Sequence, residues 1–177
     1  REEAYYKGGY PPGWRSTRSY EGGSAANQGI HFIDLIQWWM GGVKTVQGLS
    51  GTFTHNIETE DCSVALLTFK NGAFGTLTTT TSSIPPLGTR IELNSDKGTL
   101  RWKDSKIDFL YLKDGDISVI ENITLPENRP VNIFEDMIYA IREGRKPEVD
   151  GEEGIKSIKI LNAIYESSRT KEVIEIE

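Results

Sequence analysis

The chain has 177 residues, a length that fits one globular domain with its own hydrophobic core. Apolar residues make up 37% of it and charged residues 26%, both ordinary for a globular domain, while the formal net charge is -6. This acidic balance argues against a nucleic-acid-binding surface, which needs clustered basic residues. The single cysteine, Cys62, excludes an intrachain disulfide. The sequence contains no apolar run long enough for a membrane span and no signal-peptide pattern. We therefore expect a cytoplasmic protein that binds neither nucleic acid nor membranes.

The N-terminal part of the chain predicts a loop followed by one helix. Residues 1–21 are rich in glycine, proline, tyrosine and arginine and indicate a loop with a turn at 10–13. Apolar periodicity then predicts a helix over 27–39, and Gly41-Gly42 ends it.

The middle of the chain has the pattern of a β-sheet. Short segments rich in β-branched and aromatic residues predict strands at 43–54, 62–69, 74–82, 89–94, 99–103, 107–112 and 117–120. Asn71-Gly72 is a strong hairpin signal between the second and third of these strands. Consecutive strands joined by tight turns indicate antiparallel pairing. The threonine-rich segment 76–81 alternates so that threonines lie on both faces, which suits a solvated edge or a contact with another subunit.

The C-terminal part predicts two helices and a short strand. A helix is expected over 131–143, with an apolar stripe of Ile133, Phe134, Met137, Ile138 and Ile141. A second helix is expected from Asp150 to about Ser168, with a stripe of Ile155, Ile158, Leu161, Ile164 and Tyr165. We interpret both stripes as core faces, and 173–176 as a last strand. Helix, then strands, then helices indicates an α+β fold with helices on one face of a sheet.

One segment carries chemistry-bearing residues at helical spacing. Asn27 lies four residues before His31, and Asp34 lies three after it, so the helix places all three on one face. An imidazole between an amide and a carboxylate suits proton transfer. The alternative is a core histidine that bonds to its helix neighbours, and spacing alone leaves both open.

The order of motifs resembles a known family. It begins with Tyr5-Tyr6, Trp14-Arg15, Gly22-Gly23 and the segment from Asn27 through His31 to Asp34, and it continues through 57–61, 69–75, 140–151 and 163–168. This order resembles the C-terminal domain of the Gfo/Idh/MocA oxidoreductases, the family of glucose–fructose oxidoreductase and inositol dehydrogenase, over nearly the whole chain.

The resemblance implies an architecture and a cofactor. It implies a large, mainly antiparallel sheet with helices on one face, like the C-terminal domain of glyceraldehyde-3-phosphate dehydrogenase, and a single substrate-binding and oligomerisation domain over 1–177. No G-x-G-x-x-G turn follows a strand here, so the Rossmann domain that would hold NAD or NADP is expected outside this chain. The family's catalytic lysine would lie there too. By this reasoning the full-length protein is an NAD(P)-dependent enzyme and this chain alone is inactive.

The resemblance also implies roles for named residues. His31 matches the family histidine that contacts the reacting hydroxyl of a sugar, cyclitol or polyol. Asn27 stands where many members have aspartate; an amide can orient the ring or the substrate but cannot accept a proton, and we expect Asn27→Asp to be tolerated. Five further residues are expected to contact substrate: Tyr6, Trp14, Arg15, Gln28 and Asp34. Surface packing is the alternative for Tyr6, Trp14 and Arg15, and a structural bond is the alternative for Asp34.

The polar residues at 55–62 could suggest a metal site. No metal-ligand spacing matches the set His55, Glu58, Glu60, Asp61 and Cys62, so we expect no metal and a structural role for Asp61.

The resemblance implies a homo-oligomer formed through the sheet. A non-catalytic sugar-binding or assembly protein of the same fold is the alternative function, and Asn27 is the residue that supports it.

Overall fold

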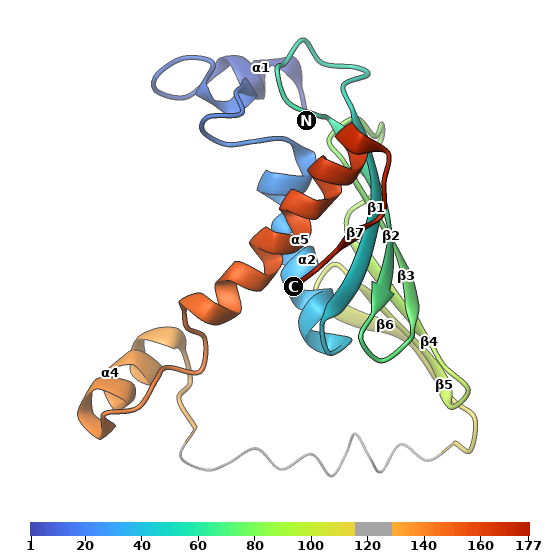
Figure 1. Ribbon diagram of the computed structural model, residues 1–177, viewed down its shortest axis with the longest axis vertical. Coiled ribbons are helices and arrows are strands. Elements are labelled where there is room, and N and C mark those ends of the chain that lie inside the picture. The colour runs from blue at the N-terminus through green and yellow to red at the C-terminus, as the bar shows by residue number, and fades with distance from the viewer. Residues whose placement is uncertain (116–128) are drawn as a thin grey trace. The chain divides into compact units, whose positions relative to one another are not determined.

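The computed structural model describes residues 1–115 and 129–177, and these form two compact units (Figure 1). Unit 1 comprises residues 1–83 and 148–177, and unit 2 comprises residues 84–147. Every site residue proposed from the sequence lies in unit 1. The strand predicted at 117–120 lies outside the described residues.

Unit 1 contains a four-stranded antiparallel sheet in the order β3-β2-β1-β7. Its strands are β1 (Val43–Gly51), β2 (Cys62–Phe69), β3 (Phe74–Thr80) and β7 (Ile174–Glu175). The Asn-Gly turn joins β2 and β3 as predicted, and Gly72 adopts φ +88°, which glycine reaches without steric cost.

Five helical segments belong to unit 1. They are α1 (Glu3–Lys7), η1 (Trp14–Ser16), η2 (Ala25–Gly29), α2 (Ile30–Trp39) and α5 (Gly151–Thr170). Of these, η1 is a 3₁₀ turn and η2 is a π-helical turn. Asp150 caps α5, because its carboxylate accepts from the backbone N–H groups of Glu152 and Glu153. No helix among the described residues is both long enough and apolar enough to span a membrane.

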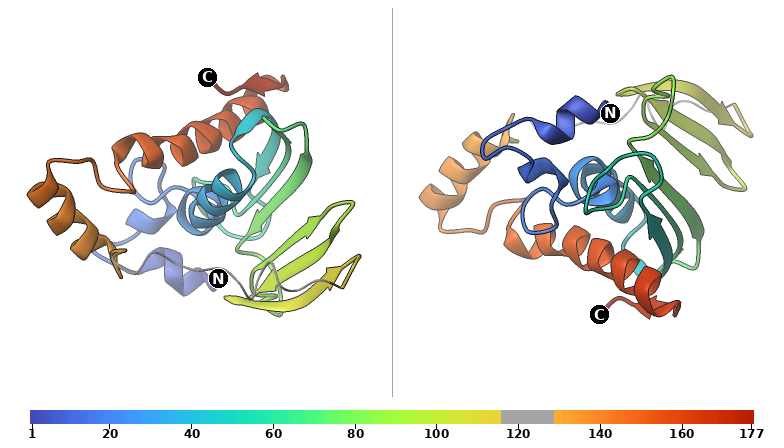
Figure 2. Two further views of the ribbon diagram at one scale, coloured as in Figure 1. Left: turned by 90° about the horizontal axis from the view of Figure 1, so that it is seen from below. Right: turned by 90° about the horizontal axis from the view of Figure 1, so that it is seen from above.

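Helices α2 and α5 cover the same face of the four-stranded sheet (Figures 1 and 2). The core lies between them and is formed by side chains such as Ile33, Val46, Leu67 and Ile164, all almost fully buried. Helix α5 approaches β1 closely at Gly48, where an added Cβ would lie 2.8 Å from the carbonyl oxygen of Ile164. The Gly48 N–H donates to Ser167 Oγ at 2.9 Å. The close approach therefore also gives this buried backbone N–H of β1 a hydrogen-bond partner.

Unit 2 contains a three-stranded antiparallel meander and a helix. Its strands are β4 (Arg90–Asn94), β5 (Gly98–Lys103) and β6 (Lys106–Leu112), and its helix is α4 (Ile133–Glu143). The Asn132 side chain caps α4 by accepting from the N–H groups of Phe134 and Glu135.

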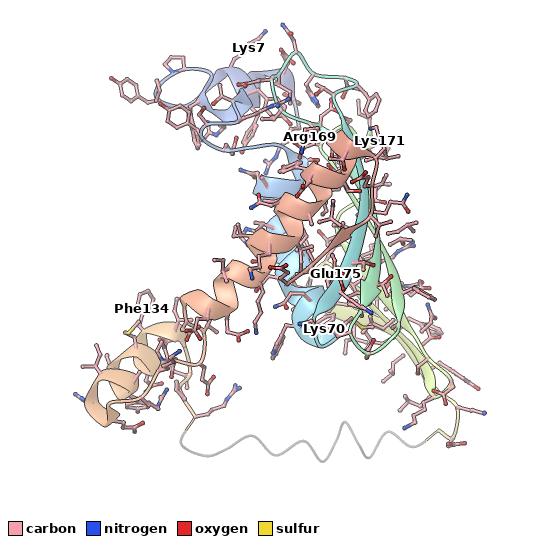
Figure 3. All side chains as sticks on the ribbon, viewed as in Figure 1. Lys7, Lys70, Phe134, Arg169, Lys171 and Glu175 are labelled. Carbon is pink, nitrogen blue, oxygen red and sulfur yellow. The ribbon has the colours of Figure 1, made fainter. Side chains whose placement is uncertain are left out.

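The predicted core role of the α4 stripe is wrong. Ile133, Phe134 and Ile141 are each at least 70% exposed, and Figure 3 shows Phe134 projecting from the helix. The buried residues of α4 are instead Asp136, which pairs with Arg145 at 2.8 Å, and Ala140. Helix periodicity identifies an apolar face but does not say whether another element covers it.

The stripe of α5 is only partly buried. Leu161 and Ile164 belong to the core, whereas Ile155 and Ile158 are exposed, because the first turns of α5 extend beyond the sheet (Figure 1).

The predicted α+β class, with antiparallel strands and helices on one face, is confirmed. Two details differ. Among the described residues the strands divide between two sheets rather than forming one large sheet. The expected N-terminal loop contains α1 and η1, both too short to give a periodic signal.

Candidate active site

The helix that carries His31 begins with a π-helical turn over 25–29, and Glu60 anchors the start of that turn. The backbone N–H of Ala25 donates to Glu60 Oε1 at 2.9 Å, and that of Ser24 donates to the Glu60 carbonyl at 2.9 Å. The same carboxylate accepts from the hydroxyl of Tyr165 on α5 at 3.0 Å. Burial, followed by the charge and hydrogen bond of Glu60, raises the pKa of Tyr165, which keeps the phenol a donor.

Two glycines let this segment lie close to its neighbours. A Cβ on Gly23 would meet the Glu60 carboxylate, and a Cβ on Gly29 would lie 2.6 Å from the Thr79 methyl group on β3. Glycine at these positions is therefore required by space. This close packing fixes where the π-helical turn, and Asn27 on it, stands relative to the sheet.

Asn27 is half-buried and held by Glu21. Its side-chain nitrogen donates to Glu21 Oε1, and its oxygen accepts from the Gln28 amide. Gln28 is exposed, so the oxygen of Asn27 accepts from a side chain that lies at the surface.

Glu21 also gathers the N-terminal loop. The Tyr5 hydroxyl donates to Glu21 Oε1 at 2.6 Å, and Arg15 Nε lies 4.0 Å from the same oxygen. Burial, together with the hydrogen bond and charge of Glu21, raises the pKa of Tyr5. The Arg15 guanidinium carbon lies 4.9 Å from the ring centroids of both Tyr5 and Trp14, within cation–π range. The structure thus brings together Trp14, Arg15 and Asn27 through a carboxylate that the sequence reasoning missed.

His31 and Asp34 are both exposed on α2. Within the described part of the chain, neither side chain makes a hydrogen bond or ion pair, so the structure does not bring them together as a pair.

Tyr6 is placed differently. It is 6% exposed, its hydroxyl donates to Thr81 Oγ1 at 2.6 Å, and its ring lies 4.8 Å from the ring of His55. Tyr6 and Asn27 both border a cleft with a free volume of about 10 Å³, room for about one water molecule.

A second polar cluster surrounds Asp61, at the start of β2. This fully buried carboxylate accepts from the backbone N–H groups of Phe53, Thr54 and His55 at 2.8–3.0 Å, and from the Thr54 hydroxyl at 2.8 Å. His55 Nδ1 lies 3.1 Å from it. Burial alone would raise the pKa of Asp61, but these hydrogen bonds hold it well below its ordinary value. Asp61 therefore has the geometry of a structural anchor, and no group of three potential metal ligands occurs among the described residues.

Comparisons with known proteins identify the family. Residues 1–176 match the model of the oxidoreductase family's C-terminal alpha/beta domain, Gfo/Idh/MocA. The chain therefore belongs to this family, as the order of its motifs indicates.

Individual relatives agree with this assignment. The chain is 24% identical over 166 residues to D-apiose dehydrogenase of Paraburkholderia graminis, covering 84% of this chain and 44% of that protein. Its fold matches the WlbA dehydrogenase of Bordetella pertussis, solved with NADH and UDP-GlcNAcA, with a TM-score of 0.82, 29% identity, and coverage of 100% of this chain and 51% of that one. Levoglucosan dehydrogenase, solved with NADH and levoglucosan, shares the fold at 17% identity and a TM-score of 0.74, over 93% and 53% of the two chains. The chain thus spans about half the length of these relatives.

At the starts of η2 and α5, the residues do not fit the pyrophosphate of a nicotinamide cofactor such as the NADH in the WlbA structure. Such a group needs free N–H donors at a helix N-terminus without nearby negative charge. Here Asp150 occupies the start of α5, which Glu152 and Glu153 follow, and Glu60 occupies the start of η2. We find no place for the cofactor's phosphates at these two helix ends.

Proposed function

We propose that the full-length protein is a nicotinamide-dependent dehydrogenase acting on a hydroxyl group of a sugar, cyclitol or related polyol, with His31 as its acid–base group. The observation that carries this proposal is the exposed imidazole of His31, which lies one turn after an amide held in place by a buried carboxylate. The names of the relatives support a carbohydrate substrate, since one acts on D-apiose and another was solved with UDP-GlcNAcA.

The proposed chemistry assigns proton transfer to this chain. Oxidation of an alcohol removes a hydride from carbon and a proton from oxygen. A bound nicotinamide cofactor would supply the hydride acceptor, and His31 would accept the proton from the hydroxyl oxygen. In the reverse direction protonated His31 returns the proton to the carbonyl oxygen. A neutral imidazole has the acceptor nitrogen that this step needs.

The remaining residues would bind the substrate. Trp14 offers an aromatic face to the C–H groups of a ring, while Arg15 and Gln28 offer donors to hydroxyl groups. Asp34 would accept a hydroxyl hydrogen bond from the next turn of α2. Tyr6 is already bonded to Thr81, so in this proposal it supports the wall of the cleft rather than binding the sugar.

A substrate panel tests this function. Full-length protein is mixed with NAD or NADP and with a panel of aldoses, uronic acids, sugar nucleotides and cyclitols, and nicotinamide absorbance is followed. We expect turnover with at least one compound and none with its deoxy analogue at the reacting carbon. Binding in a thermal-shift assay without any turnover would overturn the catalytic reading and support a sugar-binding protein, for which Asn27 is the supporting residue.

We also propose that a second copy of the chain covers the open face of the four-stranded sheet. The face opposite α2 and α5 exposes Leu49 by 55% and Leu66 by 57%, next to the outward threonines of β3. A hollow of about 590 Å³ borders this part of the sheet, and its lining includes Val64, Leu66 and Thr76 together with Ser167 and Lys171 at the end of α5. Apolar side chains on an unpacked sheet face favour association. Light scattering of the full-length protein should give a dimer or tetramer that Leu66→Asp dissociates, and a monomeric wild type would overturn this proposal.

The single cysteine, Cys62, is unpaired and supports a reducing location. Residence in the cytoplasm stays a prediction.

A further inference from the structure

Glu21 is a buried acid at the candidate active site that the proposed chemistry does not use. Its side chain is 7% exposed. One of its oxygens, Oε1, accepts from the Tyr5 hydroxyl and from the Asn27 amide and lies 4.0 Å from Arg15 Nε. Buried carboxylates are costly unless they are paired and hydrogen-bonded, so these three partners account for its stability there.

The contact between Glu21 and Asn27 fixes which way the amide points. A carboxylate can only accept hydrogen bonds, so the Asn27 atom that faces it must be the NH₂ nitrogen. The amide oxygen is then directed away from Glu21 and accepts from the exposed side chain of Gln28. With a neutral side chain that can both donate and accept in place of Glu21, either orientation of the Asn27 amide would be allowed.

We propose that Glu21 is a positioning residue that locks the Asn27 amide, so that Oδ1 accepts a hydrogen bond from a substrate hydroxyl one turn before His31. This inference rests on the proposed dehydrogenase function and deepens it. It makes position 27 selective for a hydrogen-bond donor on the ligand, because a substrate carboxylate or carbonyl oxygen would meet another acceptor there.

The proposal reverses an expectation drawn from the sequence alone. The resemblance predicts that Asn27→Asp is tolerated, but the contact with Glu21 predicts harm, since two carboxylates would share one buried contact. Glu21→Gln should also be harmful, because the new amide can pair with either end of Asn27 and the orientation is lost. The double variant Glu21→Gln/Asn27→Asp should restore function. In it, the amide introduced at position 21 donates to the carboxylate introduced at position 27, whose second oxygen still accepts from the substrate.

The experiment is a double-mutant cycle in the full-length protein with its nicotinamide cofactor and the best substrate from the panel. We expect each single variant to lower kcat/KM by about tenfold or more, chiefly through KM, and the double variant to return to within about threefold of wild type. Glu166→Gln, an exposed acid on α5, is the matched control and should leave both constants unchanged.

The outcomes separate the inference from the function on which it rests. If wild type turns over but the two single effects simply add in the double variant, Glu21 does not position Asn27 and the inference is overturned. Equal kcat/KM in all four proteins, with only the melting temperature lowered, would also overturn it, since that is the result of a purely structural acid. Absence of wild-type turnover with every substrate would overturn the dehydrogenase function, and the inference with it.

Discussion

The two histidines of this chain lie in opposite environments. His31 follows the π-helical turn on α2, where it is exposed and makes no side-chain hydrogen bond within the described residues. The His55 side chain is only 8% exposed, and both of its ring nitrogens have partners. Nδ1 lies 3.1 Å from Asp61 Oδ2, and Nε2 lies 2.9 Å from the backbone oxygen of Arg1. An imidazole committed to fixed partners stabilises a fold, whereas one without partners is free to exchange a proton with a ligand. We refer below to Tyr6, Thr54, His55 and Asp61 as the Asp61 corner.

The immediate sequence neighbours of each histidine suggest the opposite assignment. His31 stands among Ile30, Phe32 and Ile33, which looks like a core position, while His55 stands among polar residues and looks exposed. On α2, however, consecutive residues point in different directions, so Ile33 is buried while His31 is exposed. His55 is buried because a distant residue, Tyr6, packs against its ring.

The largest effect is expected from Asp61→Asn. This change removes the charge on which four donors converge and turns one acceptor into a donor facing backbone N–H groups. The free energy of unfolding should fall by about 3 kcal/mol, measured by urea denaturation. Asp34→Asn is the matched control, because Asp34 is exposed on α2, and it should leave stability within about 0.5 kcal/mol of wild type.

The same variant should also change the response to acid. The pKa of Asp61 is held below its ordinary value in the folded state, so its contribution to stability is complete above about pH 4 and is lost as the pH falls further. Wild type should therefore lose stability more steeply than Asp61→Asn below about pH 4. Parallel curves for the two proteins would show that another group controls acid unfolding.

The next effect is expected from His31→Ala in the full-length protein, on the dehydrogenase function proposed above. Loss of a general acid–base group should lower kcat by about a hundredfold or more. Because the His31 side chain makes no bond within the described residues, the free energy of unfolding should change by less than about 0.5 kcal/mol. Normal turnover with a lowered melting temperature would instead make His31 a structural histidine.

The sequence predicted the fold of unit 1 well because its signals there are local. Strand alternation and the Asn-Gly turn set β1 to β3 to within a few residues, and glycine stops α2. The exposed α4 stripe was not predictable, since its periodicity is the same whether or not a partner covers it. The π-helical turn was not predictable either, because it depends on contacts with Glu60 and Thr79, both distant in sequence.

The candidate site shows the same limit. Asn27 and His31 could be found because one helix carries them both at a recognisable spacing. Glu21 was missed because its partners, Tyr5 and Arg15, come from a loop with no periodic pattern. The only available signal was an acid placed directly before Gly22-Gly23, which points to a polar group at the start of the helical segment. The contribution of each site residue to substrate binding stays a prediction.

A smaller effect is expected from His55→Ala, the counterpart of His31→Ala. Removing this imidazole takes away its contact with Asp61 and the ring packing against Tyr6. The free energy of unfolding should fall by about 1–2 kcal/mol, since the other donors to Asp61 remain. On the proposed dehydrogenase function, the kcat of the folded full-length protein should stay within about threefold of wild type. A large loss of kcat without destabilisation would place His55 in the catalytic machinery instead.

The smallest effect is expected from Tyr6→Phe. This change tests whether Tyr6 belongs to the substrate site around His31 or to the Asp61 corner. The sequence resemblance predicts that this residue binds substrate, yet its hydroxyl donates to Thr81 at 2.6 Å and its ring packs on His55. If Tyr6 belongs to the Asp61 corner, loss of the hydroxyl should cost about 1 kcal/mol of stability and leave KM for the sugar unchanged. A rise in KM at constant stability would mean that the hydroxyl leaves Thr81 for the substrate.

Tyr5→Phe is the informative companion to Tyr6→Phe. The Tyr5 hydroxyl bonds to Glu21, so its loss should disturb the arrangement around Asn27. The two tyrosines are adjacent in the sequence, so a KM effect at Tyr5 without one at Tyr6 would place the boundary of the substrate site between them.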